Sequence, residues 1–229
     1  METSDENNTL NVYKRGQPDP VARLPLAGFL GTGDLESDIE GAALVGQRIY
    51  WIASHGRNKK GKERPDRYRF FATDIDTSSN PPTVRAVAMP YRHLLEDLQS
   101  APTLNPFRLA EAARLAPEAR GGLNIEGLAA LPDGRLLIGF RSPIPNGKAL
   151  LVPLENPGEL LAGKPARFGK PILLGLSGRG VRSIEYVGKS LLIVAGPSAD
   201  VGTFALYHWS GKPADAPRLA TGVNTADLR

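Results

Sequence analysis

The chain contains no cysteine and only three histidines, His55, His93 and His208. The first absence excludes a disulfide framework and thiolate metal sites, and the second argues against a histidine-rich zinc centre. No apolar run approaches the length of a membrane span, and the polar start METSDENNTL lacks the apolar region of a signal peptide. We therefore expect a cytoplasmic protein without a membrane span.

The positive charge of the chain is weak. Its 229 residues carry a formal net charge of +4, and aromatic residues make up only 7% of the sequence. A dedicated nucleic-acid binder is expected to cluster basic residues more strongly and to carry a stacking-aromatic motif. The composition therefore disfavours nucleic acid as a partner and favours an anionic small molecule or a protein ligand.

A P-loop-like motif lies in the stretch WIASHGRNKKGKERPDRYRFF (51–71), where G-x-x-x-x-G-K runs from Gly56 to Lys62. A true P-loop needs Ser or Thr after the lysine and a helix whose N-terminus faces the phosphates. Here Glu63 follows the lysine, and the strand-like YRFFATDI stands where the helix should begin. The motif is therefore not predicted to bind a nucleotide.

Three segments of the chain share one pattern. DIEGAA (38–43) leads into RIYWIASHG, NIEGLA (124–129) leads into RLLIGFRSP, and SIEYV (183–187) leads into SLLIVAGPS. Each has an Ile-Glu start, a short strand, a glycine-containing turn and then a nearly unbroken apolar strand. Glycine supplies the backbone angles that such a tight hairpin requires. The three segments are therefore predicted to be equivalent hairpins.

Two further strand-like runs follow each hairpin, which gives four strands per unit. Repeated four-stranded units are typical of β-propeller blades, whose middle strands are buried on both faces and therefore lack polar–apolar alternation. The sequence predicts an all-β, incomplete β-propeller of about three to four blades. A β-sandwich with a similar number of strands is the structural alternative.

The predicted propeller is a single domain over residues 1–229 that lacks part of the ring. Its parts are a half blade (9–30), a blade (36–90), a short helical insertion (91–118), a second blade (120–176) and a third (180–223). In the insertion, Asn105 is predicted to cap a helix, Pro106 to occupy its first position and Pro117 to end it.

The loop after the first apolar strand is strongly basic, and it includes Arg57, Lys62 and Arg67. Arg141 stands after the corresponding strand of the next unit. Because arginine offers planar, two-pronged donors to phosphate and carboxylate, these four residues are predicted to bind an anionic substrate or ligand. The alternative is a solvated basic loop without a partner.

Glu40, Glu126 and Glu185 occupy the same place in the three predicted units. If the innermost strands line a central channel, these carboxylates and Asp38 could converge there on a hard cation such as Ca²⁺. In that case Glu126 or Glu40 would activate water, and His55 would act as a general acid or base. The alternatives are that each glutamate accepts backbone N–H groups at a turn and that His55 is a hydrogen-bonded loop histidine.

The two long motifs DIEGAALVGQRIYWIASHGRNKKGKERPDRYRFFATDI and GGLNIEGLAALPDGRLLIGFRSP, together with GKALLVPLENP, resemble a bacterial family known only as domain of unknown function 3616. The resemblance covers most of the chain and implies a propeller-like fold without an established activity. It also implies that family members carry more sequence at both ends. The element IEGLAALPDGRLL is more loosely similar to the repeat of esterase-like phytase propellers.

Two functions follow from these observations and remain open at this point. One is a Ca²⁺-dependent ester or phosphoester hydrolase of the phytase-like or lactonase-like kind. The other is a non-catalytic propeller that binds a ligand or a protein on its loop face.

Overall fold

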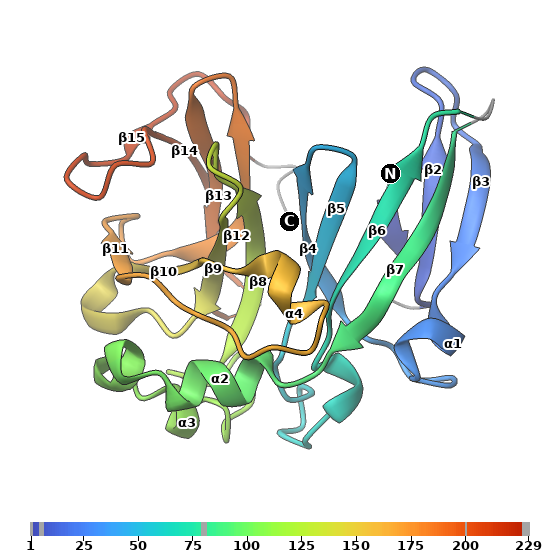
Figure 1. The fold of residues 1–229 in the computed structure, drawn as a ribbon. Helices are drawn as coiled ribbons and strands as arrows, with labels where there is room; N and C mark the ends of the chain where they lie inside the picture. The colour runs from blue at the N-terminus through green and yellow to red at the C-terminus, as the bar shows by residue number, and fades with distance from the viewer. Residues whose placement is uncertain (1, 5–6, 79–81, 200, 226–229) are drawn as a thin grey trace.

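The computed structural model describes residues 2–4, 7–78, 82–199 and 201–225, which form four antiparallel sheets arranged side by side (Figure 1). Sheet I is three-stranded and contains β1 (Glu2–Ser4), β2 (Thr9–Tyr13) and β3 (Pro20–Pro25). Sheet II contains β4 (Ile39–Val45), β5 (Arg48–Ala53), β6 (Phe70–Asp76) and β7 (Thr83–Tyr91). Sheet III contains β8 (Asn124–Ala130), β9 (Leu136–Ser142), β10 (Ala149–Leu154) and β11 (Ile172–Leu174). Sheet IV contains β12 (Gly180–Val187), β13 (Ser190–Gly196), β14 (Ala205–Trp209) and β15 (Arg218–Leu219).

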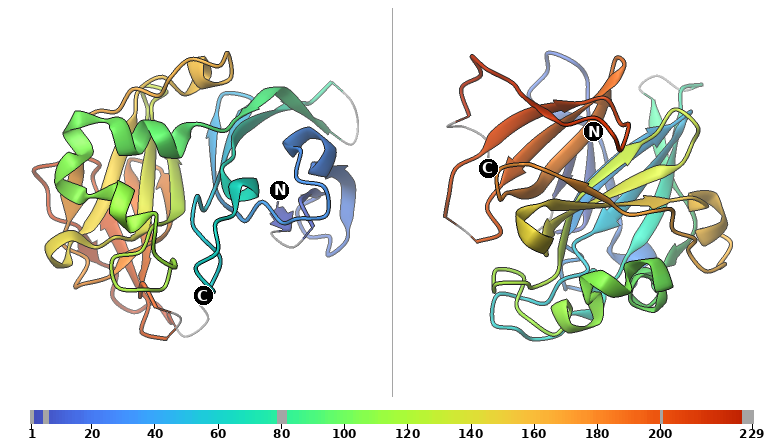
Figure 2. Two further views of the ribbon diagram at one scale, coloured as in Figure 1. Left: turned by 90° about the horizontal axis from the view of Figure 1, so that it is seen from below. Right: turned by 90° about the vertical axis from the view of Figure 1, so that its left-hand side faces the viewer.

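Each of sheets II, III and IV is a blade in which consecutive strands pair from the inside outward. Their first strands meet at the centre of the molecule, where β8 packs between β4 and β12 (Figures 1 and 2). The prediction of an all-β, incomplete β-propeller is therefore confirmed, with three four-stranded blades and one three-stranded sheet. The sandwich alternative is excluded because the sheets follow one another around a common inner edge.

Three layers of apolar side chains join the four sheets. The strand β5 is apolar from Ile49 onward because both of its faces are buried. Ile49 and Trp51 pack toward sheet I, whereas Tyr50 and Ile52 pack toward sheet III. In the same way β9 divides its side chains between the layer it shares with sheet II and the layer it shares with sheet IV. Alternate residues of a strand point to opposite faces, so a strand between two blades needs apolar residues at every position.

Glycine allows sheets III and IV to approach each other closely. A methyl group at Gly139 would lie 2.7 Å from Val181 Cγ1, and one at Gly127 would lie 2.8 Å from the same atom. Both distances are shorter than a carbon–carbon contact allows, so these positions in β8 and β9 require glycine for the observed packing.

Short helices lie outside the sheets. They are α1 (Ala27–Leu30), α2 (Leu94–Ser100), α3 (Leu109–Ala112), α4 (Pro157–Leu160) and the 3₁₀ helices η1 (Pro65–Arg67), η2 (Pro102–Phe107) and η3 (Pro145–Gly147). The helices α2, η2 and α3 lie between β7 and β8, where the sequence predicted an insertion. They pack at the end of the molecule that also carries the β5–β6 loop, at the bottom of Figure 1. We call this end the loop face.

The details predicted for the insertion are wrong. Asn105 and Pro106 lie inside η2 and do not begin a helix, and the last helix ends at Ala112, before Pro117. The reason is local: Pro102 begins a 3₁₀ helix, and Arg108 adopts a left-handed conformation with φ of 52° that separates η2 from α3.

Candidate functional site

A buried carboxylate lies on the loop face where sheets III and IV meet. Glu126 is only 4% exposed, and its Oε1 accepts hydrogen bonds from Arg141 Nη1 at 3.0 Å and from Asn124 Nδ2 at 2.9 Å. Its Oε2 lies 2.9 Å from Arg182 Nε. Burial raises the pKa of Glu126, while Arg182 and Arg141 oppose that shift. The carboxylate is thus held by two guanidinium groups from neighbouring strands and blades.

The strand register shows which residues are equivalent in the three blades. In the β4–β5, β8–β9 and β12–β13 pairs, one residue near the start of the inner strand is skipped as a bulge: Glu40, Glu126 and Arg182 respectively. Glu185 lies three residues farther along β12, opposite Leu192. The prediction that Glu185 occupies the same place as Glu40 and Glu126 is therefore wrong. The Ile-Glu dipeptide of the third unit is out of register because the bulge falls at Val181-Arg182-Ser183.

The three glutamates also lie in different surroundings. Glu40 and Glu185 are exposed, whereas Glu126 is buried and ion-paired. Asp38 lies 2.7 Å from Arg67 Nη1, and Arg67 also pairs with Glu36. In the part of the chain that the structure describes, no three acidic or histidine side chains gather in a way that could hold a metal ion. Asp38 and Glu126 each face arginine.

The predicted general acid or base, His55, is buried. It adopts a left-handed conformation (φ 55°) and its Nδ1 lies 2.7 Å from the carbonyl oxygen of Ala53, which means that Nδ1 carries the proton. Nε2 has no hydrogen-bond partner among the described residues. Burial lowers the pKa of His55 to about 4, with a smaller contribution from Arg69. The ring stacks on Tyr68 and is only 1% exposed, so a substrate in solution does not reach it.

The arginines of the β5–β6 loop point inward and hold the loop together. Arg57 Nε donates to the carbonyl of Ala113 at 2.9 Å, and its Nη1 donates to Gly61 O at 3.0 Å. Arg69 Nε donates to Leu30 O at 2.8 Å. The lysines of the loop, Lys62 among them, are exposed. Of the four residues predicted to bind an anion, three pair with carboxylates of the chain itself: Arg57 with Glu63, Arg67 with Asp38 and Arg141 with Glu126.

Arg57 lines a cavity of about 250 Å³ between the β5–β6 loop and the helical insertion. Arg92, just before α2, and Arg114, just after α3, line the same cavity. No sequence pattern connects these two arginines with Arg57, because they lie 35 and 57 positions after it and meet it only when the insertion folds back onto the loop. The other polar residues of the lining are Glu63, Tyr68, Glu96 and Gln99.

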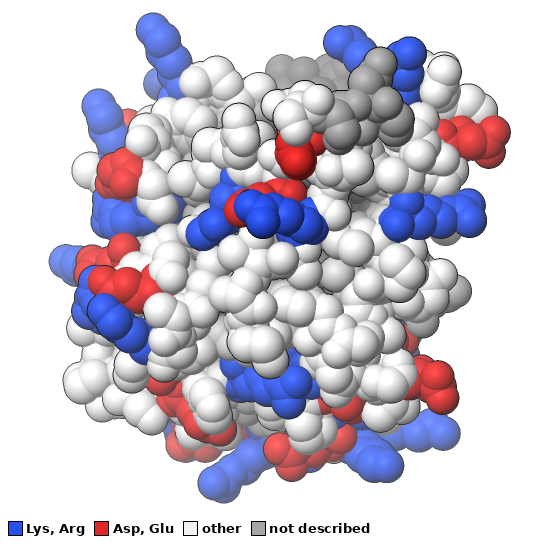
Figure 3. Space-filling view, turned by 45° about the vertical axis from the view of Figure 1, so that its right-hand side comes forward, with Lys and Arg blue, Asp and Glu red and all other residues white. Residues whose placement is uncertain are grey.

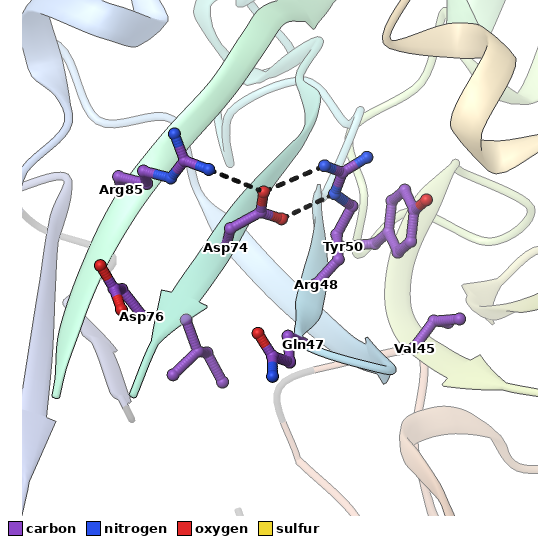
Figure 4. A pocket seen from close by; sticks show the side chains of 8 residues that line it. Val45, Gln47, Arg48, Tyr50, Asp74, Asp76 and Arg85 are labelled. Carbon is purple, nitrogen blue, oxygen red and sulfur yellow. Dashed lines mark hydrogen bonds and ion pairs between the residues drawn. The ribbon is translucent and has the colours of Figure 1, made fainter. Parts of the chain in front are cut away.

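A second, larger depression of about 810 Å³ lies on sheet II, away from the loop face (Figure 4). Across three adjacent strands, Arg48 and Arg85 flank Asp74: Arg48 Nε lies 2.8 Å from Asp74 Oδ1, and Arg85 Nη2 lies 3.7 Å from Oδ2. The Arg48 hydrogen bonds lower the pKa of Asp74. Since the residues are cross-strand neighbours, the triad stabilises the pairing of β5, β6 and β7.

The charges on the surface are mixed in sign. Figure 3 shows acidic and basic side chains interspersed over one face, without a large area of either sign. No helix in the described part of the chain combines the length and the apolar character needed to cross a membrane.

Comparison with known proteins gives a family and distant likenesses to solved structures. No curated protein matches the chain. A solved structure of the Trypanosoma rangeli sialidase in complex with 2,3-difluorosialic acid (covalent intermediate) is similar at 14% sequence identity and a TM-score of 0.38. The match covers 82% of this chain and 28% of the sialidase chain. The chain therefore spans less than a third of the length of that structure.

The family described as "Protein of unknown function (DUF3616)" matches residues 72–224. The match covers more than half of the chain, including the whole of sheets III and IV and the helical insertion. The chain therefore belongs to this family, as its motifs predicted.

Proposed function

We propose that the chain is a non-catalytic binding propeller that takes a small oxyanion, phosphate or a compact carboxylate, on its loop face. The observation that carries this proposal is the convergence of Arg57, Arg92 and Arg114 on one cavity of about 250 Å³. Guanidinium groups match phosphate and carboxylate oxygens with two parallel hydrogen bonds, and a cavity of this size accommodates a single tetrahedral anion.

Two carboxylates, those of Glu63 and Glu96, also line the cavity, and both are already engaged. Glu63 Oε1 lies 3.5 Å from the hydroxyl group of Tyr68, and its Oε2 lies 3.9 Å from Arg57 Nη2. Glu96 pairs with His93 Nδ1 at 2.9 Å. Arg114 forms no ion pair within the described part of the chain. The lining therefore keeps a positive charge for a ligand.

The cavity is also partly organised before a ligand arrives. The hydrogen bonds from Arg57 to Ala113 O and Gly61 O fix its guanidinium group, and Arg92 Nη2 donates to Leu30 O at 3.2 Å. Fixed donors reduce the side-chain entropy that binding must overcome. Burial raises the pKa of Tyr68, which keeps its phenol protonated and able to donate.

The hydrolase function, and the similarity to esterase-like phytases that suggested it, remain predictions. The arrangement of the predicted catalytic residues does not support them. Glu126 is held by two arginines, and His55 is buried, so neither faces a ligand in solution. The predicted Ca²⁺ likewise has no set of three acidic ligands among the described residues. Binding is therefore the function that the loop face supports better.

Calorimetric titration with inorganic phosphate tests the proposal. We expect saturable binding to the parent protein and a loss of affinity of about tenfold in Arg114→Gln, which corresponds to one charge-assisted hydrogen bond. Arg114 is exposed, so this change leaves the fold intact. The matched control is Arg218→Gln on the exposed strand β15, which should bind like the parent. Equal phosphate binding by all three proteins, or hydrolysis of a phosphoester or lactone panel that Glu126→Gln abolishes, would contradict the proposal.

A further inference from the structure

A third concave site, a recess, lies on the other side of the helical insertion. Its volume is about 610 Å³, and it lies between the end of η2, residues 118–121, the β9–β10 loop and the loops of sheet IV. Its apolar wall consists of Pro106, Phe107, Pro143, Ile144 and Pro145. Two arginines, Arg108 of the insertion and Arg120 just after it, line the same recess. Each of the two pockets on either side of the insertion thus has its own arginines.

Among the charged side chains that line this recess, one arginine is available to pair with a ligand. Glu118 lies 3.4 Å from Lys59 Nζ, and Arg108 Nη2 lies 3.2 Å from Glu111 Oε1. Arg120 is exposed and forms no ion pair with the residues that the structure describes. An anionic group entering the recess would therefore meet Arg120 without displacing a carboxylate.

Hydrogen bonds connect the backbone beside the recess to the contact between sheets III and IV. Arg141, which holds Glu126, also donates from Nε to Pro197 O at 3.2 Å and from Nη2 to Ala199 O at 3.0 Å. Ser142, which follows Arg141, is only 1% exposed. Because these hydrogen bonds and the neighbouring prolines fix the backbone here, the recess is formed before a ligand binds.

We propose that this recess binds an organic acid with a flat apolar body, whose carboxylate or sulfonate pairs with Arg120. Small-molecule sites are concave, mostly apolar and supplied with a few polar groups that set orientation, and their volumes are typically about 300–1,000 Å³. A lone phosphate would leave the proline and phenylalanine wall unused. A neutral apolar molecule would fill the wall but leave Arg120 without a partner.

Two fluorescent probes with the same ring system test this assignment: anilinonaphthalenesulfonate, which is anionic, and N-phenylnaphthylamine, which is neutral. We expect Arg120→Gln to weaken binding of the sulfonate about tenfold and to leave binding of the neutral probe unchanged. Ala199→Trp, which places an indole at the exposed edge of the recess, should abolish binding of both. Ala214→Trp, at an exposed position before β15, is the matched control and should change neither.

The Arg114→Gln variant separates this inference from the proposed function. It should weaken phosphate binding and leave both fluorescent probes unaffected, because Arg114 lines the other cavity. Arg120→Gln should weaken binding of the sulfonate and leave binding of phosphate and of the neutral probe unchanged. If Arg120→Gln and Ala199→Trp bind the sulfonate as the parent does, the probe lies elsewhere on the molecule and the inference fails. If Arg120→Gln weakens both probes equally, the recess does not distinguish an acid, and the assignment of the ligand class fails.

Discussion

Glu126 and Arg182 are bulged residues at equivalent places in adjacent blades, and they form an ion pair of 2.9 Å with each other. The position that is acidic in sheet III is basic in sheet IV. Arg141 supplies a second guanidinium group at 3.0 Å. Bulges are features that re-aim side chains, and here they turn one acid and one base toward the contact between two blades. The equivalent position in sheet II is the exposed Glu40.

Packing between sheets III and IV should be sensitive to a single methyl group at Gly139. We predict that Gly139→Ala lowers the free energy of unfolding by about 1–3 kcal/mol, because the new methyl group would lie 2.7 Å from Val181 Cγ1. Val181→Ala in the same chain should restore part of the loss by removing that atom. Gly175→Ala, where no atom lies within 4 Å of the added methyl group, is the control. Urea unfolding measures all four proteins, and equal losses at positions 139 and 175 would contradict the packing argument.

Stability should depend on pH through His55. Its pKa in the folded state is about 4, below the ordinary value of 6.5. Between these values the unfolded chain binds a proton that the folded chain does not, so the free energy of unfolding should fall as the pH drops from 6.5 to 4. The shift corresponds to a loss of about 3 kcal/mol.

His55→Asn is the comparison for this pH dependence, since asparagine tolerates the left-handed backbone and does not titrate. Unfolding in urea at several pH values should show a smaller fall for the variant than for the parent. Parallel curves would show that His55 is not buried in its neutral form.

Calcium should leave the stability of the chain unchanged. At a calcium concentration 100 times the dissociation constant, a site in the folded state would add about 2.7 kcal/mol. Because Glu126 faces two arginines and Glu40 and Glu185 are exposed, we expect the same melting temperature with Ca²⁺ and with EDTA. A rise with Ca²⁺ that Glu126→Gln removes would instead support the predicted channel site.

The sequence predicted the blades because apolar strands such as β5 and β9 lack alternation, which is the direct consequence of burial on both faces. It put Glu185 in the wrong register, because no residue around Arg182 indicates the bulge that sets the register of β12. It also could not show that Arg67 and Arg141 face carboxylates, since both partners are distant in the chain. Arg92 and Arg114 escaped notice for the same reason.

The cavity lined by Arg57, Arg92 and Arg114 and the recess beside Arg120 share one physical origin. The insertion 91–118 folds onto the loop face and closes a space on each side of itself. Substituting Arg114 or Arg120 therefore tests each pocket separately, whereas deleting the insertion would remove both pockets.

Glu126 links two blades from a buried position, and a double-mutant cycle measures that link most directly. Glu126→Gln alone should lower the free energy of unfolding by about 3–5 kcal/mol, because it leaves two arginines without their carboxylate. With Arg182→Met and the double variant, the cycle should give a coupling energy of at least about 1 kcal/mol in favour of the pair. Strictly additive losses, or an unchanged stability of Glu126→Gln, would show that Glu126 does not join the blades and would return it to the candidates for catalysis.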